Sequence, residues 1–440
     1  MTAAVSQPAD SARLEFSHAD DATSVGSMAG KWLVIASVMF NPLLCFLDTK
    51  GILHASSSSV ALAELLIILA ATWYIRRSMS SMAVILSLII SGYVVGAHLI
   101  NPAASLKILH DLWIPYIFYL LGTAASMVTA RKTMNIVMVL VLLFGFFELF
   151  AFSTYGQFFN VWKYYVDKGA LGADVINYSN TTSFVSGNRG ADARTYFPSI
   201  LGSVRVASVF LEPVSMGNFA TIVFAWGLSI WKNKKGERPI ILLMLGFLCI
   251  ILTDSRFATG CCFLMVLIRM TPFVRSSLLV FCMPILIMTV LTMVGSMFEI
   301  PGVHPSILVD DLKGRLLFSG RLLDDWGLAP WFAFAASPVY TADTGYAYLC
   351  NNLGAPLSVL LFFIFAFHKN GSREAVIMKT MLAVYFATSL CIGANAATIK
   401  TGSLVWFLYG VLDTGGRRKG AERATLSGWT NSLKRQPAFR

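Results

Sequence analysis

Residues 187–218 read GNRGADARTYFPSILGSVRVASVFLEPVSMGN, and they lie between two strongly hydrophobic parts of the chain. The stretch ends a long polar segment and places Arg189, Arg194, Arg205 and Glu212 beside a run of apolar residues. Charged side chains next to a lipid bilayer are costly unless they contact water, one another or a charged substrate. The stretch therefore predicts a functional site, and an anionic, lipid-linked substrate is the first candidate ligand.

The composition of the whole chain agrees with a membrane setting. Hydrophobic residues make up 56% and charged residues 13% of the 440 residues, and the mean hydropathy is +0.68. A soluble globular protein has an apolar share of about 45–50%. We therefore predict an all-α polytopic membrane protein. Its formal charge of +11 indicates which connections stay in the cytoplasm, and no nucleic acid partner is expected.

Apolar segments long enough to cross a bilayer, roughly 17–25 residues, recur along the chain. They predict about 12 transmembrane helices, with a range of roughly 10–13 because some segments are short or interrupted by polar residues. The segments are 28–47, 60–75, 82–100, 109–128, 134–152, 214–231, 239–253, 257–274, 277–298, 349–368, 375–394 and 398–412.

Lysine and arginine in every second connection predict the orientation of these segments, because such connections face the cytoplasm. The basic residues are Arg76, Arg77, Arg131, Lys132, those of the run KNKKGER over 232–238, Arg275, Lys369 and Arg373. Both termini are predicted to lie in the cytoplasm. We expect a disordered cytoplasmic tail at 1–27, a multi-span membrane domain at 28–412 and a basic cytoplasmic tail at 413–440.

The same alternation places two long polar segments, 153–213 and 299–348, outside the cytoplasm. Loops longer than about 12–15 residues are uncommon unless they are functional or disordered. Both segments are rich in Trp, Tyr and Phe, which disordered linkers lack. We predict two large, partly helical extracytoplasmic loops that pack on the membrane face.

Charged residues on the outer side form the candidate site. If residues 205–212 are helical, Arg205 and Glu212 lie two turns apart on one face, and a structural salt network is the alternative reading. The triplet Asp254-Ser255-Arg256 stands at the tip of a helical hairpin, where Arg256 could equally anchor the helix end. The second loop contributes His304, Arg315, Arg321, Asp343 and Tyr346.

Three short motifs follow one another within residues 187–361. The pattern R-x-x-S-x-F-x-E-P covers 205–213, S-R stands at 255–256, and S-G-R…W…D-x-G-Y…G runs from 319 to 354. This ordered set, with the number and orientation of the spans, resembles the Wzy-type polysaccharide polymerase and O-antigen ligase superfamily. The pattern and length of the loops resemble those of exopolysaccharide polymerases, including the xanthan type.

The resemblance implies a metal-independent membrane glycosyltransferase, without a cofactor, in the bacterial inner membrane. Such a polymerase joins undecaprenyl-diphosphate-linked oligosaccharide repeat units into exopolysaccharide or O-antigen at the periplasmic face. A chain-length-regulating co-polymerase and a flippase are the partners that the resemblance implies. A ligase that transfers the same donor to a lipid A-core acceptor is the alternative within the superfamily.

The residues support this chemistry independently. Cleavage of a glycosyl–diphosphate bond leaves phosphate charge, which guanidinium groups stabilise with two-pronged hydrogen bonds. The acceptor hydroxyl needs a general base, usually a carboxylate or an imidazole. The predicted catalytic residues are Glu212 and His304, and the predicted substrate-binding residues are Arg205, Arg256, Arg321, Arg194, Arg315, Asp343 and Tyr346; Asp343 is also a third candidate base.

A transporter or flippase is the alternative from a different class. It would carry charged or helix-breaking residues in the middle of its spans. The acidic residues in the predicted spans are Glu64, Asp111 and Glu148. These three residues are too scattered along the chain to indicate an ion relay. The sequence therefore favours an enzyme.

Overall fold

The computed structural model describes residues 9–76, 79–102, 105–170, 182–183, 187, 194–231, 239–297, 312–337, 341, 344–393 and 398–415. Within these ranges the regular secondary structure is helical and contains no β-strand. The all-α class predicted from the sequence is therefore confirmed for the described part of the chain.

Long helices form a bundle, and short helices lie in the connections. The bundle contains α1 (Ala9–Thr49), α2 (Ser57–Ile75), α3 (Ser81–Ile100), α4 (Lys107–Ala124), α5 (Met127–Phe150), α9 (Pro213–Ile230), α10 (Pro239–Thr253), α11 (Arg256–Met270), α12 (Ser277–Met297), α16 (Ala355–Phe367), α17 (Arg373–Ser389) and a helix over 399–415. The short elements are α6 (Phe152–Phe158), α7 (Val161–Asp167), α8 (Pro198–Leu201), η4 (Ser208–Phe210), η5 (Pro272–Arg275), α13 (Leu312–Asp324), α14 (Leu328–Trp331) and α15 (Gly345–Leu353).

Five helices among the described residues are long and apolar enough to cross a membrane: α1 from Met28 onward, α2, α5, α9 and α12. The chain is thus a helical membrane protein by the length and composition of its helices. The count of about 12 spans stays a prediction, because α10 and several other bundle helices are shorter or more polar than this test requires.

Helix α1 extends from Ala9 to Thr49. One prediction from hydropathy differs from the structure. The predicted span 349–368 is broken, because α15 and α16 meet at an angle of 110°. Gly354 stands at the break with a φ of +76°, which residues with a Cβ rarely adopt.

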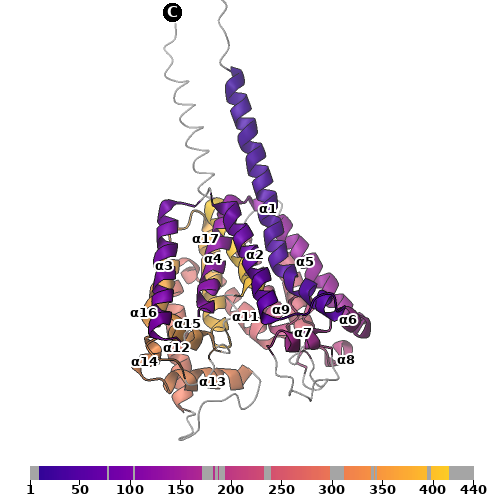
Figure 1. The fold of residues 1–440 in the computed structure, drawn as a ribbon, viewed down its shortest axis with the longest axis vertical. Helices are drawn as coiled ribbons and strands as arrows, with labels where there is room; N and C mark the ends of the chain where they lie inside the picture. The colour runs from indigo at the N-terminus through magenta and orange to yellow at the C-terminus, as the bar shows by residue number, and fades with distance from the viewer. Residues whose placement is uncertain are drawn as a thin grey trace, which may run out of the picture.

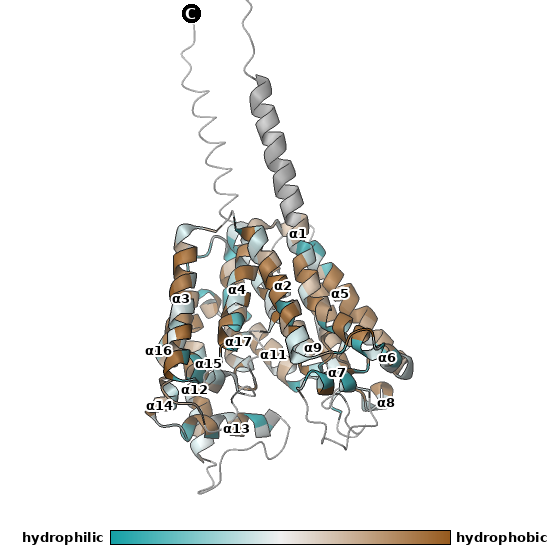
Figure 2. Ribbon diagram, in the orientation of Figure 1, coloured by the Kyte–Doolittle hydropathy of each residue, from teal (hydrophilic) through white to brown (hydrophobic). Residues whose placement is uncertain are grey.

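The helices that belong to the two predicted outer loops lie at one end of the bundle. Helices α7, α8 and α13 are found at the end opposite to the start of α1 (Figure 1). Hydrophobic residues run along the bundle helices, whereas α7 is largely hydrophilic (Figure 2). We call this end, with α7 and α13, the loop end.

Helix α9 is the centre of the bundle, and 89% of its apolar window is buried. It packs against α10, α11 and α17 and against η4. Close packing requires small residues: a Cβ built on Gly217 would lie 2.6 Å from the Ser255 Oγ atom at the start of α11. The helix that follows Glu212 is therefore held on several sides, which fixes the position of that carboxylate.

Candidate functional site

The segment that leads into α9 is buried and not α-helical. Glu148, near the end of α5, accepts hydrogen bonds from the backbone N–H groups of Ala207 (2.9 Å) and Ser208 (2.7 Å). Ser208 has a φ of 55°, a left-handed conformation that is costly for a residue with a Cβ. Residues 205–212 do not form one helix, because the chain turns through η4 between Arg205 and Glu212; the shared helix face that a helical stretch would give them is therefore absent.

Arg205 lies inside this segment with 5% of its surface exposed. Its Nε atom donates to the Thr253 carbonyl oxygen at 2.9 Å, and its backbone N–H donates to the Gly187 carbonyl oxygen at 2.8 Å. The C-terminal carbonyl groups of an α-helix lack partners within the helix. At least part of the Arg205 guanidinium therefore caps the end of α10.

Arg194 has a similar position and is also buried. Its guanidinium donates to backbone carbonyl oxygens of Tyr196 (3.1 Å), Val204, Ile251 (3.1 Å) and Leu252 (2.9 Å). These contacts join the segment before α8 to the end of α10. They give Arg194 a structural role, whereas the sequence predicted that it binds substrate.

The tip of the α10–α11 hairpin holds the same segment from the other side. Asp254, in a left-handed conformation with a φ of 49°, accepts hydrogen bonds from the backbone N–H groups of Thr195 and Tyr196, both at 2.9 Å. Arg256 is exposed, and its Nε donates to the Thr195 hydroxyl at 2.8 Å. Of the arginines near the tip, Arg256 is the one that a ligand in solution can reach.

Glu212 precedes α9 and is surrounded by polar partners at the loop end. Its Oε1 accepts from the Tyr165 hydroxyl at 2.6 Å, and its Oε2 accepts from the Ser215 hydroxyl at 2.8 Å. The Lys400 Nζ lies 3.5 Å from Oε2 and also contacts the Tyr165 hydroxyl at 3.3 Å. The side chains of Lys400 and Glu212 are 12% and 24% exposed, so the pair is half-buried. We call Glu212, Lys400, Tyr165 and Lys168 the lysine site.

Lys168 completes the lysine site from the end of α7. Its Nζ lies 3.6 Å from the centre of the Tyr165 ring, a cation–π contact. Burial, followed by the positive charge of Lys400, lowers the pKa of Lys168 to about 7, although Glu212 acts in the opposite direction. An ammonium in this place is poorly stabilised unless an anion approaches it.

The positive charges of the two lysines stabilise the charged form of Glu212. Burial alone raises the pKa of Glu212, but Lys400, Lys168 and the two hydroxyl donors outweigh it and hold the pKa at about 2. A general base is most effective when its pKa is near the working pH. Glu212 is therefore a permanent negative charge, and its predicted role as a base is disfavoured.

A second polar group combines two acidic residues that the sequence interpretation left apart. The His110 Nδ1 lies 3.1 Å from Asp111 Oδ1, and its Nε2 lies 3.3 Å from Glu64 Oε2. The Tyr348 hydroxyl of α15 donates to Asp111 Oδ2 at 2.9 Å. Electrostatic interactions link Glu64 with Lys400, so this group borders the lysine site.

Helix α13 carries two of the predicted arginines. Arg321 is 7% exposed and Arg315 is half-buried. The neighbouring Ser319 hydroxyl donates to the Cys391 carbonyl oxygen at 2.7 Å. The Tyr346 hydroxyl donates to the Ala387 carbonyl oxygen at 2.9 Å. Both α13 and α15 are therefore attached to the end of α17, and Tyr346 is part of that attachment.

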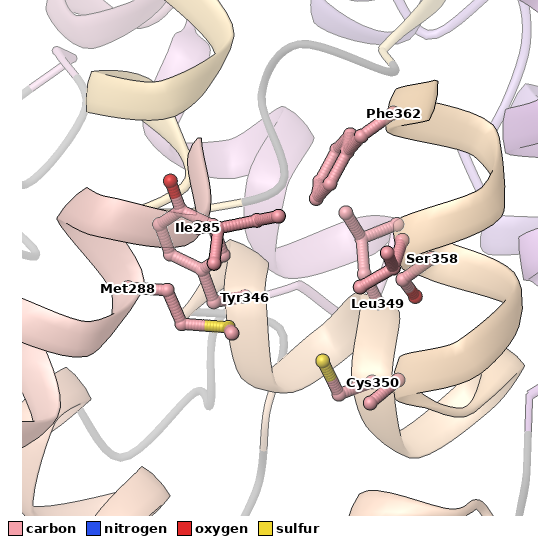
Figure 3. Close-up of a pocket in the computed structure, with 9 residues that line it drawn as sticks. Ile285, Met288, Tyr346, Leu349, Cys350, Ser358 and Phe362 are labelled. Atoms are coloured by element: carbon pink, nitrogen blue, oxygen red, sulfur yellow. The ribbon is translucent and has the colours of Figure 1, made fainter. Parts of the chain in front are cut away.

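An apolar pocket lies beside α13, where α12, α15 and α16 meet (Figure 3). Its walls include Ile285 and Met288 from α12, Leu349 from α15 and Phe362 from α16. The bend between α15 and α16 shapes one side of it. The lining is apolar, but the cavity volume of about 10 Å³ is close to that needed for one water molecule, so the pocket is a small gap in the packing.

One group of side chains has the atoms and spacing of metal ligands. Asp48, His54 and Asp167 have oxygen or nitrogen atoms within 4.8 Å of one another. The Lys163 ammonium lies 2.8 Å from Asp48 Oδ2 and 2.6 Å from Asp167 Oδ2. This ammonium occupies the position between the carboxylates and neutralises them, so the arrangement fits a structural ion-pair network.

Comparison with known proteins assigns no family. A scan against protein-family models matches none, and searches of curated proteins and of solved structures find no match.

The predicted site residues thus differ in whether a ligand can reach their polar atoms. Glu212 and Arg256 lie at the loop end with reachable polar atoms, whereas Arg194 and Tyr346 are engaged in internal contacts. His304 and Asp343 lie outside the described residues. The sequence interpretation missed two groups, the Lys400 ammonium and the His110 imidazole. The sequence offered one signal for each group: Lys400 stands at the start of an apolar segment, and His110 stands beside Asp111.

Proposed function

We propose that the chain polymerises lipid-diphosphate-linked oligosaccharide units into a polysaccharide, as the resemblance in the sequence implies. The observation that supports this proposal is the lysine site, where two half-buried ammonium groups face a single carboxylate at the loop end. A surplus of positive charge in a partly desolvated site favours the binding of an anionic ligand. A diphosphate has the charge and the oxygen atoms to satisfy both lysines.

The reaction requires stabilisation of the leaving diphosphate. As the glycosidic bond breaks, negative charge grows on the phosphate oxygens, and positioned cations stabilise the transition state more than the ground state. Lys168, Lys400 and the exposed Arg256 are the proposed cations. Glu212 holds Lys400 in place through the contact at 3.5 Å. Arg205 supports the site by fixing the segment before α9.

The lipid part of the substrate needs an apolar surface next to the cations. We propose that exposed apolar side chains of the bundle helices, such as Leu62 and Leu66 of α2, provide it. The donor is proposed to be an undecaprenyl diphosphate glycan, bound at the periplasmic face of a bacterial inner membrane with both termini of the protein in the cytoplasm.

Turnover by the purified protein tests this function. The protein in detergent or liposomes is incubated with a synthetic undecaprenyl-diphosphate oligosaccharide, and the lipid-linked products are separated by size. We expect products that grow by whole repeat units. Loss of a charged contact worth about 1.5–3 kcal/mol lowers kcat/KM by roughly 10–100-fold, so Lys400→Met should do so.

The matched control is Lys132→Met. Lys132 is exposed near the start of α5, at the end of that helix away from Glu148, and its variant should keep the wild-type rate. Absence of elongation by folded wild-type protein would reject the proposal. Transfer of a long glycan to a lipid A-core acceptor would indicate the ligase, and movement of the intact lipid across the bilayer would indicate the flippase.

A further inference from the structure

A histidine held between two carboxylates lies at the border of the lysine site and has no part in the function proposed above. His110 stands in the first turns of α4, and its Nδ1 contacts Asp111 Oδ1 at 3.1 Å. Its Nε2 faces Glu64 Oε2 of α2 at 3.3 Å and is buried without a hydrogen-bond partner in the described part of the chain. The side chains of His110 and Glu64 are 26% and 22% exposed, so the group is partly exposed although the Nε2 atom itself is buried.

The chemistry of these contacts indicates a missing proton. A neutral imidazole has one N–H donor and one lone pair. When Nδ1–H donates to Asp111, the Nε2 lone pair faces a carboxylate oxygen of Glu64, and two lone pairs repel. One added proton on Nε2 or on Glu64 changes this contact into a charge-assisted hydrogen bond. The group therefore gains a favourable interaction when it takes up one proton.

Other contacts fix the orientation of the group. The Tyr348 hydroxyl donates to Asp111 Oδ2 at 2.9 Å, which leaves Oδ1 for the imidazole. An imidazole that is oriented by one carboxylate and faces a second one can share a proton that the second carboxylate takes up, which suits the pair to general-base catalysis through Glu64. Asp111 and Tyr348 act as positioning residues.

We propose that Glu64 and His110 together accept the proton of the acceptor sugar's hydroxyl during glycosyl transfer, an inference that rests on the proposed function. The O–H bond of the acceptor breaks as its oxygen forms a bond to the anomeric carbon of the donor. The bond from that carbon to the diphosphate oxygen breaks, and its electron pair leaves with the diphosphate. The proton goes to the Glu64–His110 pair and later returns to water. The lysine site stabilises the leaving group while the pair activates the nucleophile.

Charged and titratable groups surround the pair. The charged or titratable groups that face it are Asp111 and Lys107 on its own helix, Lys400 and Lys168 from the lysine site, and Tyr348 through Asp111. A substitution in the pair therefore also changes the electrostatic surroundings of the lysine site, so the test below compares kcat with KM.

The test uses full-length protein and the defined lipid-diphosphate oligosaccharide. General bases contribute about 10²–10⁴-fold to rate, so His110→Gln and Glu64→Gln should each lower kcat by that order with little change in KM. Tyr348→Phe should lower kcat by a smaller factor and shift the acid side of the pH profile. The control is His368→Gln. The His368 Nε2 lies 3.1 Å from Asp413 Oδ2, and Asp413 is about 20 Å along helix 399–415 from Lys400.

Each outcome decides between defined possibilities. Wild-type protein without turnover rejects the proposed function itself. Active wild type together with folded His110→Gln and Glu64→Gln variants that keep the wild-type rate and pH profile rejects the proton-acceptor role alone. If one variant does not fold, the other decides. An equal loss of activity in His368→Gln would also overturn the inference, because a remote histidine would then have the same effect.

Discussion

Removal of the Glu148 carboxylate should loosen the segment that leads into α9. Glu148 is 3% exposed, and a single oxygen, Oε2, accepts both the Ala207 and the Ser208 backbone N–H groups. In Glu148→Ala, two buried donors lose their acceptor. Each buried donor left without a partner costs about 1–3 kcal/mol. Part of this loss is offset because a buried carboxylate is also removed, so we expect a net destabilisation of about 2–4 kcal/mol.

Glu148→Gln is the matched control for this prediction. Its amide oxygen can take the position of Oε2 and accept the same two N–H groups. Only the charge assistance is lost, and neutral hydrogen bonds are roughly half as strong as charge-assisted ones. The glutamine variant should therefore lose about half as much stability as the alanine variant.

Two measurements check the expected order of wild type, Gln and Ala. Thermal unfolding of the detergent-solubilised protein, followed by size-exclusion chromatography, should give midpoints that decrease in this order. Hydrogen exchange should show faster exchange at Ala207 and Ser208 in the alanine variant, because the left-handed conformation of Ser208 loses its support. Equal midpoints and equally slow exchange in all three proteins would refute the role assigned to Glu148.

Further predictions concern packing and pH. A Cβ on Gly320 would lie 2.2 Å from the Leu291 carbonyl oxygen, whereas a Cβ on Gly260 would meet no atom within 4 Å. Gly320→Ala should therefore reduce the yield of folded protein, measured by size-exclusion chromatography, by much more than Gly260→Ala. The pKa of Glu212 is about 2 in the folded state, reached through Lys400, Lys168 and hydrogen bonds that outweigh burial. The Glu212 carboxylate therefore contributes about 3 kcal/mol to the free energy of unfolding above pH ~4.5, and this contribution is lost as the pH falls toward 2. Glu212→Gln should flatten the acid side of a plot of melting temperature against pH. The pKa of Lys168 is about 7 in the folded state, mainly because of burial, so the unfolded chain binds more protons between pH ~7 and ~10.4 and stability should rise with pH across that interval. Lys168→Met should abolish this rise, and an unchanged slope would contradict the burial of the amine.

The helical architecture was predictable because the length and apolarity of a segment decide whether it can cross a bilayer. The bend at Gly354 was not, because α15 and α16 pass the test for a span together and hydropathy averages over the break. The sequence left open whether residues 205–212 are helical. Pro213 marks the start of α9, but the turn that Glu148 stabilises at Ala207 and Ser208 depends on a carboxylate far away in the sequence.

The candidate site was only partly predictable for a similar reason. Sequence identifies an arginine but not the acceptors that its guanidinium finds, so Arg194 looked equivalent to Arg256 although it donates to four backbone carbonyl groups. The contacts of Lys400 with Glu212, and of His110 with Glu64, join helices that are distant along the chain. Single-sequence patterns report neighbours on one helix and carry no signal for such pairs.

The short hairpin of α10 and α11 has a consequence for the lipid around the protein. Each helix has 15 residues, which corresponds to a rise of about 22 Å, whereas the hydrocarbon layer of a typical bilayer is about 30 Å thick. If α10 and α11 cross the bilayer as the sequence predicts, the acyl chains on this flank must shorten or tilt to meet the polar tip at Asp254. A mismatch of this kind has a free-energy cost for every ångström, so the protein is better matched to thin membranes, and short-chain lipids should gather beside α10 and α11.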